Sequence, residues 1–145
     1  MSHKGHTGTK GEKGVKVGFV ASCFDLLHAG HCLMLKDAKS QCDRLVAALH
    51  VDPSRERIDK NTPIQSVEER LIQLQSIKYV DEILTYENER GLIDLLKKVR
   101  PNVRILGSDY MGQHFTGKNL GIPIFYHIRS HEWSSSNLRS RIKNA

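Results

Sequence analysis

Cysteine is scarce in this chain, and its pattern argues against a structure held together by disulfides. Among 145 residues there are three cysteines, Cys23, Cys32 and Cys42, an odd number without a C-x-x-C pair. A disulfide framework is therefore not expected, and a reducing cytoplasm is the expected compartment. A zinc site built from these thiols with His31 or His50 would match no standard ligand spacing, so we expect no resident metal site.

Long apolar runs are lacking as well. No segment approaches the roughly 20 apolar residues that a membrane-spanning helix needs, so no membrane partner is expected. The opening residues 1–14 hold glycine, lysine and histidine without the apolar core of a secretory signal. We expect them to be a disordered tail ahead of one domain over 15–145. An arm of lysines and histidines that touches substrate or partner is the alternative for this tail.

Positive charge is in excess but is not concentrated. The chain has 22 Lys and Arg against 16 Asp and Glu, a net charge of +6. Neither an arginine-rich block nor a strip of interleaved aromatic residues accompanies this excess, so nucleic acid is not an expected partner. A diffuse positive charge suits a small anionic substrate.

Apolar strand-like runs alternate with helical patterns along the chain. This alternation predicts an α/β fold, a Rossmann-like doubly wound parallel sheet with helices on both faces. Ligands of such sheets bind beyond the carboxyl ends of the strands, where the strand order reverses. The expected strands are Val15–Ala21, Arg44–Val51, Glu82–Thr85, Val103–Leu106 and Ile122–Ile128, and the expected helices are Ala29–Gln41, Val67–Ile77, Glu89–Val99 and one after the serines at 134–136.

The segment Cys23-Phe24-Asp25-Leu26-Leu27-His28-Ala29-Gly30-His31 follows the first expected strand and opens the first expected helix. The free N–H groups of a helix N-terminus favour anions. Two imidazoles three residues apart lie close to one face of the first turn, and Gly30 would let a phosphate approach the backbone. The segment therefore predicts a polyphosphate site, with two histidines that have no role as the alternative.

A second such segment lies near the chain end. Ser134, Ser135 and Ser136 follow the last expected strand and precede a helical pattern, which predicts a second phosphate-binding helix start with Arg129 and Arg139 as partners. An ordinary serine N-cap is the alternative, and it explains one serine better than three.

Together these segments resemble the small cytidylyltransferases, most of all the glycerol-3-phosphate cytidylyltransferases. That family has G-T-F-D-x-x-H-x-G-H near its N-terminus and R-T-E-G-I-S-T-[ST] near its C-terminus. The likeness covers about residues 17–142. This chain departs from the family pattern at two places: Ser22-Cys23 replaces Gly-Thr, and Ser130-His131-Glu132-Trp133 replaces Thr-Glu-Gly-Ile. A less close resemblance extends to the heptose-phosphate and riboflavin-nucleotide adenylyltransferases. Further matches are Asp43-Arg44-Leu45-Val46-Ala47-Ala48, Glu68-Glu69-Arg70, Tyr79-Val80-Asp81-Glu82-Ile83 and Gly107-Ser108-Asp109-Tyr110.

The resemblance implies transfer of CMP from CTP to a phosphorylated polyol, glycerol 3-phosphate first, with release of pyrophosphate. It also implies a homodimer and Mg²⁺ held mainly through substrate phosphates. The alternatives are an adenylyltransferase that uses ATP with a sugar phosphate or flavin nucleotide, and a regulatory module that binds nucleotide without turnover. A synthetase domain with an H-x-G-H element would need a longer chain.

Residue roles follow from the same resemblance and from the pattern. The expected catalytic residues are His28, His31, Lys60 and Arg129. The expected nucleotide- or phosphate-binding residues are Ser22, Cys23, Phe24, Asp25, Gly30, Arg70, Gly107, Asp109, Trp133, Ser134, Ser135 and Ser136. Lys60 lies in the polar loop 52–66. This loop is expected to be either a lid that closes over the substrate or a solvated loop without such a role. Asp25 is expected to orient the loop or His28, or to reach the metal through water. The Cys23 thiol lies beside a helix N-terminus, where its pKa can fall, but direct phosphoryl displacement needs no nucleophile.

Overall fold

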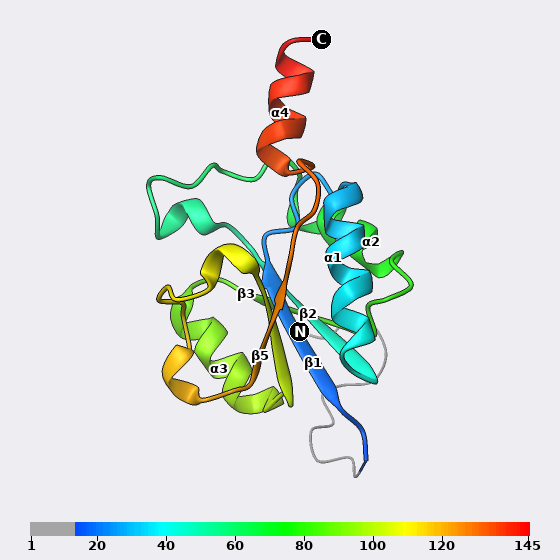
Figure 1. Ribbon diagram of the computed structural model, residues 1–145. Helices are drawn as coiled ribbons and strands as arrows, with labels where there is room; N and C mark the ends of the chain where they lie inside the picture. Colours follow the sequence, from blue (N-terminus) through cyan, green and yellow to red (C-terminus); the bar gives the residue numbers. More distant parts are fainter. Residues whose placement is uncertain (1–13) are drawn as a thin grey trace.

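A five-stranded parallel sheet forms the centre of the molecule (Figure 1). The computed structural model describes residues 14–145, so the expected tail lies, but for Gly14, outside the described residues. The strands are β1 (Val17–Ser22), β2 (Arg44–His50), β3 (Glu82–Tyr86), β4 (Val103–Gly107) and β5 (Ile124–His127). Their order is β3-β2-β1-β4-β5 and every neighbouring pair is parallel, which confirms the doubly wound α/β architecture.

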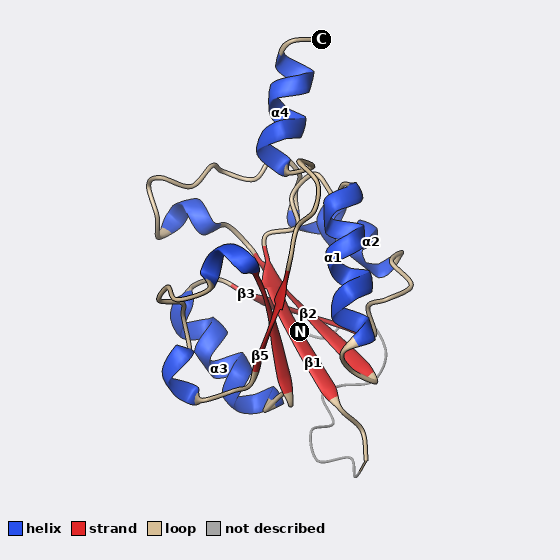
Figure 2. Cartoon of the chain, viewed as in Figure 1, coloured by secondary structure: helices blue, strands red, loops and turns tan. Residues whose placement is uncertain are grey.

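Helices connect the strands and cover both faces of the sheet (Figure 2). They are α1 (Ala29–Ser40), α2 (Val67–Gln75), α3 (Glu89–Val99) and α4 (Ser135–Lys143), with short 3-10 helices η1 (Pro53–Arg55), η2 (Ser108–Tyr110) and η3 (Lys118–Leu120). The strands and the first three helices begin and end within two residues of the expected bounds. Among the described residues, no helix is long and apolar enough to span a bilayer.

Two apolar cores form because strand side chains alternate between the faces of the sheet. On β2, Leu45, Ala47 and Leu49 pack in the core that includes Leu35 of α1 and Leu74 of α2. The intervening β2 residues pack on the opposite face, in the core that contains buried leucines of α3. Because both faces are covered, β2 reads as a continuous apolar run rather than an alternating one.

The strand order places the candidate site. From β1 the chain moves outward through β2 and β3, and then returns to the other side of β1 with β4 and β5. The order therefore reverses between β1 and β4, and the loops after these strands face the same crevice. Helix α4 follows β5 and extends away from this edge of the sheet (Figure 1), and no residue of α4 is fully buried.

Candidate functional site

A cavity of about 380 Å³ lies at the carboxyl edge of the sheet, where the strand order reverses. It is lined by the start of α1, by η2 after β4, and by the segment between β5 and α4. The two histidine- and serine-bearing segments, more than 90 residues apart in the chain, thus meet across one cavity. The lining residues are His28, Gly30, His31, Met34, Gly107, Ser108, Asp109, His127, Arg129, His131, Trp133, Ser134 and Ser135.

His28 and His31 cap the start of α1 reciprocally. The Nδ1 of His28 accepts from the backbone N–H of Gly30 at 3.0 Å and of His31 at 3.4 Å. In return, the Nδ1 of His31 accepts from the backbone N–H of His28 at 3.2 Å. A neutral imidazole that accepts at Nδ1 carries its proton on Nε2. Both side chains therefore keep an Nε2–H donor for a ligand, which is the form that phosphate oxygens need.

Burial keeps these two imidazoles neutral. Desolvation lowers the pKa of His31 to about 3, and the neighbouring His28 contributes to the same shift. The pKa of His28 is lowered as well, chiefly by desolvation and then by the charges of His131 and Arg129. Neutral donors bind phosphate oxygens by hydrogen bonds without gaining or losing a proton at neutral pH.

Gly30 is required by protein packing more than by ligand approach. A Cβ on Gly30 would lie 2.7 Å from the backbone O of Trp133, 2.8 Å from Cε1 of His28 and 3.0 Å from Cε1 of His131. The sequence interpretation, an opening for phosphate, is corrected on this point because side chains and the 131–133 backbone already fill the space beside its Cα. Gly30 still lines the cavity and lets the two segments approach each other.

The three serines before α4 do three different things. The Oγ of Ser134 accepts from the backbone N–H of Asn137 at 3.0 Å and caps the helix. The Oγ of Ser135 donates to the backbone O of Asp25 at 3.0 Å, which ties α4 to the loop after β1. Both line the cavity, whereas Ser136 is exposed elsewhere. The expected phosphate-binding role of Ser136 therefore finds no support in the position of its side chain, which does not line the cavity.

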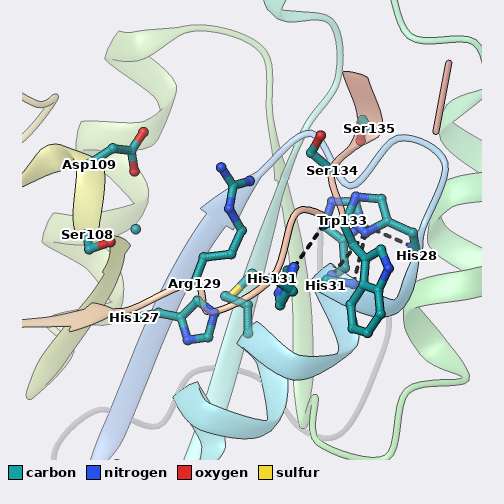
Figure 3. Close-up of a pocket in the computed structure, with 13 residues that line it drawn as sticks. His28, His31, Ser108, Asp109, His127, Arg129, His131, Trp133, Ser134 and Ser135 are labelled. Carbon is teal, nitrogen blue, oxygen red and sulfur yellow. Dashed lines mark hydrogen bonds between the residues drawn. The ribbon is translucent and has the colours of Figure 1, made fainter. Parts of the chain in front are cut away.

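The segment between β5 and α4 brings a cation and an aromatic pair to the cavity. The guanidinium of Arg129 projects between η2 and the α1 histidines (Figure 3). The ring of His131 stacks on Trp133, with ring centroids 4.9 Å apart. The half-exposed Trp133 is thus placed for contact with a base or acceptor, and its role toward a ligand stays a prediction.

The turn after β4 forms the opposite wall of the cavity. Gly107, Ser108 and Asp109 line the cavity there (Figure 3). A Cβ on Gly107 would lie 2.6 Å from Oδ1 of Asp109, so the carboxylate rests against the glycine backbone. The two expected residues of this turn are brought to the site.

Seven of the expected site residues do not line the cavity. They are Ser22, Cys23, Phe24, Asp25, Lys60, Arg70 and Ser136. Ser22 accepts from the backbone N–H of Phe24 at 3.3 Å and the ring of Phe24 is buried in the core. Lys60 is exposed in the loop 52–66, and its closure over a substrate stays a prediction.

Arg70 positions loops and is not available to a nucleotide. It is 2 % exposed. Its guanidinium donates to the backbone O atoms of Cys23 at 3.0 Å, His50 at 2.8 Å and Val51 at 2.7 Å. Its Nε donates to the backbone O of Gln65 at 3.1 Å. The expectation that Arg70 binds the nucleotide directly is therefore wrong, because its donors already bind the carbonyls at the ends of β1 and β2.

The environment of Cys23 also differs from the expectation. Its Sγ lies 3.4 Å from NH1 of Arg70, and burial raises the pKa of the thiol despite this cation and that of Arg139. The helix N-terminus does not lower it, because desolvation outweighs the attraction of nearby positive charges. Cys23 is thus a neutral thiol in the loop after β1.

Asp25 holds the loop after β1 to two other segments. Its carboxylate accepts from the backbone N–H groups of Ile64 and Gln65, both at 2.9 Å, and from Arg139 at 2.7 Å. Of the expected roles for Asp25, orientation of loops agrees with this geometry. Arg139, expected beside a phosphate, is engaged by this carboxylate instead.

Four lining residues were missed by sequence reasoning, namely Met34, Ser108, His127 and His131. His127 ends β5, and the carboxyl ends of parallel strands face the ligand in this fold, which is the signal that could have found it. His131 lies between the expected Arg129 and Trp133. Ser108 likewise lies between the expected Gly107 and Asp109, whereas Met34 carries no such signal.

The carboxylates and imidazoles do not form a metal cage. Within residues 14–145, no three His, Cys, Asp or Glu side chains are placed to share a metal ion. Mg²⁺ held mainly through substrate phosphates stays a prediction, and Asp109 is a carboxylate on the cavity wall.

Residues 19–141 match the family model described as cytidylyltransferase-like, which spans most of the domain and both cavity segments. The chain belongs to the cytidylyltransferase-like family. It is therefore a nucleotidyltransferase-type domain.

Curated relatives share part of their length with this chain. The chain is 38 % identical over 109 residues to "Bifunctional protein HldE" of Caulobacter vibrioides, and 41 % identical over 100 residues to the protein of the same name from Acidiphilium cryptum. These alignments cover 74 % and 68 % of this chain but 22 % and 20 % of the relatives. The chain thus spans about one fifth of the length of these curated relatives. Specific likeness to glycerol-3-phosphate cytidylyltransferase finds no support among them.

Solved structures show the same architecture. A lipopolysaccharide core biosynthesis protein from Thermoplasma volcanium superposes with a TM-score of 0.63 at 26 % identity, over 83 % of this chain and 100 % of that one. The pantoate-beta-alanine ligase of Francisella tularensis superposes with a TM-score of 0.62 at 22 % identity, over 88 % of this chain and 66 % of that one. At this identity, the likeness to the ligase shows a shared fold and no more.

Proposed function

We propose that this domain transfers AMP from ATP to a sugar phosphate of the heptose-phosphate type and releases pyrophosphate. The observation that carries the proposal is the cavity in which the Nε2–H donors of His28 and His31, the cation of Arg129 and the N-terminus of α4 face one another. The likeness to the HldE proteins favours the ATP and heptose-phosphate branch.

The reaction is an in-line displacement at the α-phosphorus of the nucleotide. A phosphate oxygen of the acceptor forms a new bond to this phosphorus, and the bond to the β-phosphate oxygen breaks. Mg²⁺ held by the phosphates would neutralise part of the charge on the leaving pyrophosphate. The acceptor phosphate is already ionised near neutral pH, so alignment and charge stabilisation are the main tasks of the protein.

The chain's own residues supply that alignment. His28 and His31 would donate from Nε2 to oxygens of the reacting phosphates, most strongly when charge gathers there in the transition state. Arg129 would pair with the acceptor or leaving phosphate. Ser134 and Ser135 already make intramolecular hydrogen bonds, so their backbone N–H groups at the start of α4 are the proposed phosphate donors.

Transfer of CMP to glycerol 3-phosphate is the second candidate. It is supported by the ordered motifs of the sequence and by the cytidylyltransferase-like family model. The nucleotide distinguishes the two candidates, because the phosphate-handling residues are the same in both. A homodimer is a further proposal that rests on the resemblance alone.

A pyrophosphate-release assay tests the proposal. ATP, CTP, GTP and UTP are each offered with Mg²⁺ and with heptose 1-phosphate, other sugar phosphates, glycerol 3-phosphate and flavin mononucleotide. The proposal expects turnover with ATP and a sugar phosphate, and a loss of about 10²–10³-fold in kcat for His31→Gln, by analogy with oxyanion donors. His114→Gln, an exposed histidine in the loop after η2, is the matched control. CTP-specific turnover would reverse the nucleotide assignment, and tight nucleotide binding without turnover across the whole panel would support the regulatory module.

A further inference from the structure

The cavity contains one histidine whose hydrogen bonding is opposite to that of the other three. His28, His31 and His131 each accept a backbone N–H at Nδ1, the last from Trp133 at 3.0 Å. A backbone N–H can only donate, so each of these neutral rings carries its proton on Nε2; the Nε2 of His131 is buried without a partner among the described residues. His127 instead has its Nδ1 at 2.7 Å from Oδ2 of Asp37 on α1.

The carboxylate partner reverses the tautomer of His127. An ionised carboxylate only accepts hydrogen bonds, so the proton of the neutral ring must lie on Nδ1 and the lone pair on Nε2. The Nε2 of His127 is buried and has no hydrogen-bond partner among the described residues. A buried acceptor without a partner is costly, and a ligand hydrogen bond would remove that cost.

The surroundings of His127 match this acceptor character. Ser108 and Asp109 lie on the same wall, while His28, His31 and Trp133 lie across the cavity, with Arg129 between (Figure 3). One wall therefore offers N–H donors suited to phosphate oxygens. The other wall offers a lone pair, a hydroxyl and a carboxylate, which accept hydrogen bonds from hydroxyl groups.

We infer that His127, oriented by Asp37, is a specificity-determining residue that accepts a hydrogen bond from a hydroxyl group of a polyhydroxylated substrate bound in this cavity. His127 would touch the substrate, and Asp37 is a positioning residue that acts through the ring. The inference rests on the proposed function for the kind of substrate, because both the sugar phosphate and the ribose of the nucleotide carry such hydroxyl groups.

The first test reads the tautomer without any substrate. Long-range ¹H–¹⁵N spectra of histidine-labelled protein should show His127 protonated on Nδ1, and His28, His31 and His131 protonated on Nε2. In Asp37→Asn, the amide can donate to Nδ1 and should move the His127 proton to Nε2 with little change of shape. Asp94→Asn, an exposed carboxylate on α3, is the matched control and should leave all four rings unchanged. An Nε2 proton on His127 in the unmodified protein would overturn the inference.

The second test removes one hydroxyl from the ligand at a time. The arms are 2′-deoxy-ATP and 3′-deoxy-ATP against ATP, and monodeoxy sugar phosphates against the parent sugar phosphate. One of these deletions should lower kcat/KM about tenfold in the unmodified protein, the size of one neutral hydrogen bond. In Asp37→Asn, kcat/KM for the parent substrate should fall to the value measured with that deoxy analogue, while kcat/KM for the analogue should stay unchanged. The arm that shows this loss identifies the source of the hydroxyl.

The outcomes separate this inference from the proposed function. An unchanged penalty for every missing hydroxyl in Asp37→Asn would overturn the role of His127 while ATP-dependent turnover continued. If no nucleotide and acceptor pair turns over, the proposed function fails. The tautomer spectra and calorimetric binding of ATP and its deoxy analogues to both proteins then still decide the role of His127.

Discussion

Asp25 and Arg139, which are 114 residues apart in the chain, form an ion pair with 2.7 Å between Oδ2 and NH2. Asp25 is 5 % exposed, and its carboxylate also accepts the backbone N–H groups of Ile64 and Gln65. One buried carboxylate thus joins the loop after β1, the end of the loop 52–66 and helix α4. Because no residue of α4 is fully buried, the ion pair of Arg139 in the middle of the helix and the hydrogen bond of Ser135 at its start tie α4 to the loop after β1.

We predict that Arg139→Ala destabilises the protein through this junction. The change leaves a buried carboxylate with backbone partners alone, so the free energy of unfolding should fall by about 2 kcal/mol. Urea denaturation measures the change, and hydrogen exchange of α4 should accelerate with it. Arg141→Ala, an exposed residue on the same helix, is the control and should change stability by less than about 0.5 kcal/mol. Equal losses of unfolding free energy in Arg139→Ala and Arg141→Ala would contradict a stabilising role for the ion pair between Asp25 and Arg139.

Gly30→Ala should impair activity while the fold persists. The new methyl group would collide with the backbone O of Trp133 at 2.7 Å, so the 131–133 segment must move away from α1. We expect kcat/KM to fall at least tenfold, because misplacement by about 1 Å can cost a hundredfold. Steady-state kinetics measure this, and circular dichroism checks the fold. Gly91→Ala, where the nearest atom is 3.4 Å away, is the matched control. Full activity of Gly30→Ala would show that the segment tolerates displacement.

Arg70→Met should act on stability rather than on nucleotide affinity. The substitution leaves the carbonyl groups of Cys23, His50 and Val51 without the donor that now satisfies them. We expect a loss of about 3–5 kcal/mol, as for other broken buried charge networks. Thermal unfolding measures the loss, and calorimetry at a temperature where the variant is folded should give an almost unchanged Kd for ATP. Arg90→Ala, whose side chain is 88 % exposed, is the control. A large loss of affinity in folded Arg70→Met would restore a direct binding role.

Stability should fall in acid because His31 is buried in its neutral form. Its pKa is about 3 in the folded protein against 6.5 as the ordinary value, so below pH 6.5 the unfolded chain binds a proton that the folded one does not. The stability that the neutral, buried His31 contributes is therefore complete above pH 6.5 and is lost as the pH falls from 6.5 toward 3, by about 3 kcal/mol at pH 4.5.

Urea denaturation at pH 7.5, 5.5 and 4.5 measures this dependence. His31→Gln should show a smaller acid loss, because glutamine titrates nowhere in this range and can still cap the backbone N–H of residue 28. The exposed His114→Gln should retain the full dependence of the unmodified protein. The same slope in all three proteins would show that other groups dominate the acid limb.

The sequence by itself determined the alternation of strands and helices, hence the parallel sheet and the edge at which sheets of this kind bind ligands. Local patterns were enough for this, because apolar periodicity and capping residues such as Asn88 and Ser66 act within a few neighbouring residues. The motif at 28–31 likewise predicted a pair of phosphate donors at a helix start. Sequence motifs did not separate CTP from ATP, since the residues proposed to bind phosphate would serve either nucleotide.

Tertiary structure alone decided which side chains face the cavity. Arg70 and Asp25 belong to segments that fit the family motifs, yet folding buries both against backbone groups from distant segments. His127 and Asp37 are 90 residues apart and form a hydrogen-bonded pair only where β5 lies beside α1. The direction of a side chain and the partner that sets its tautomer depend on contacts between distant segments, which no local pattern of residues encodes.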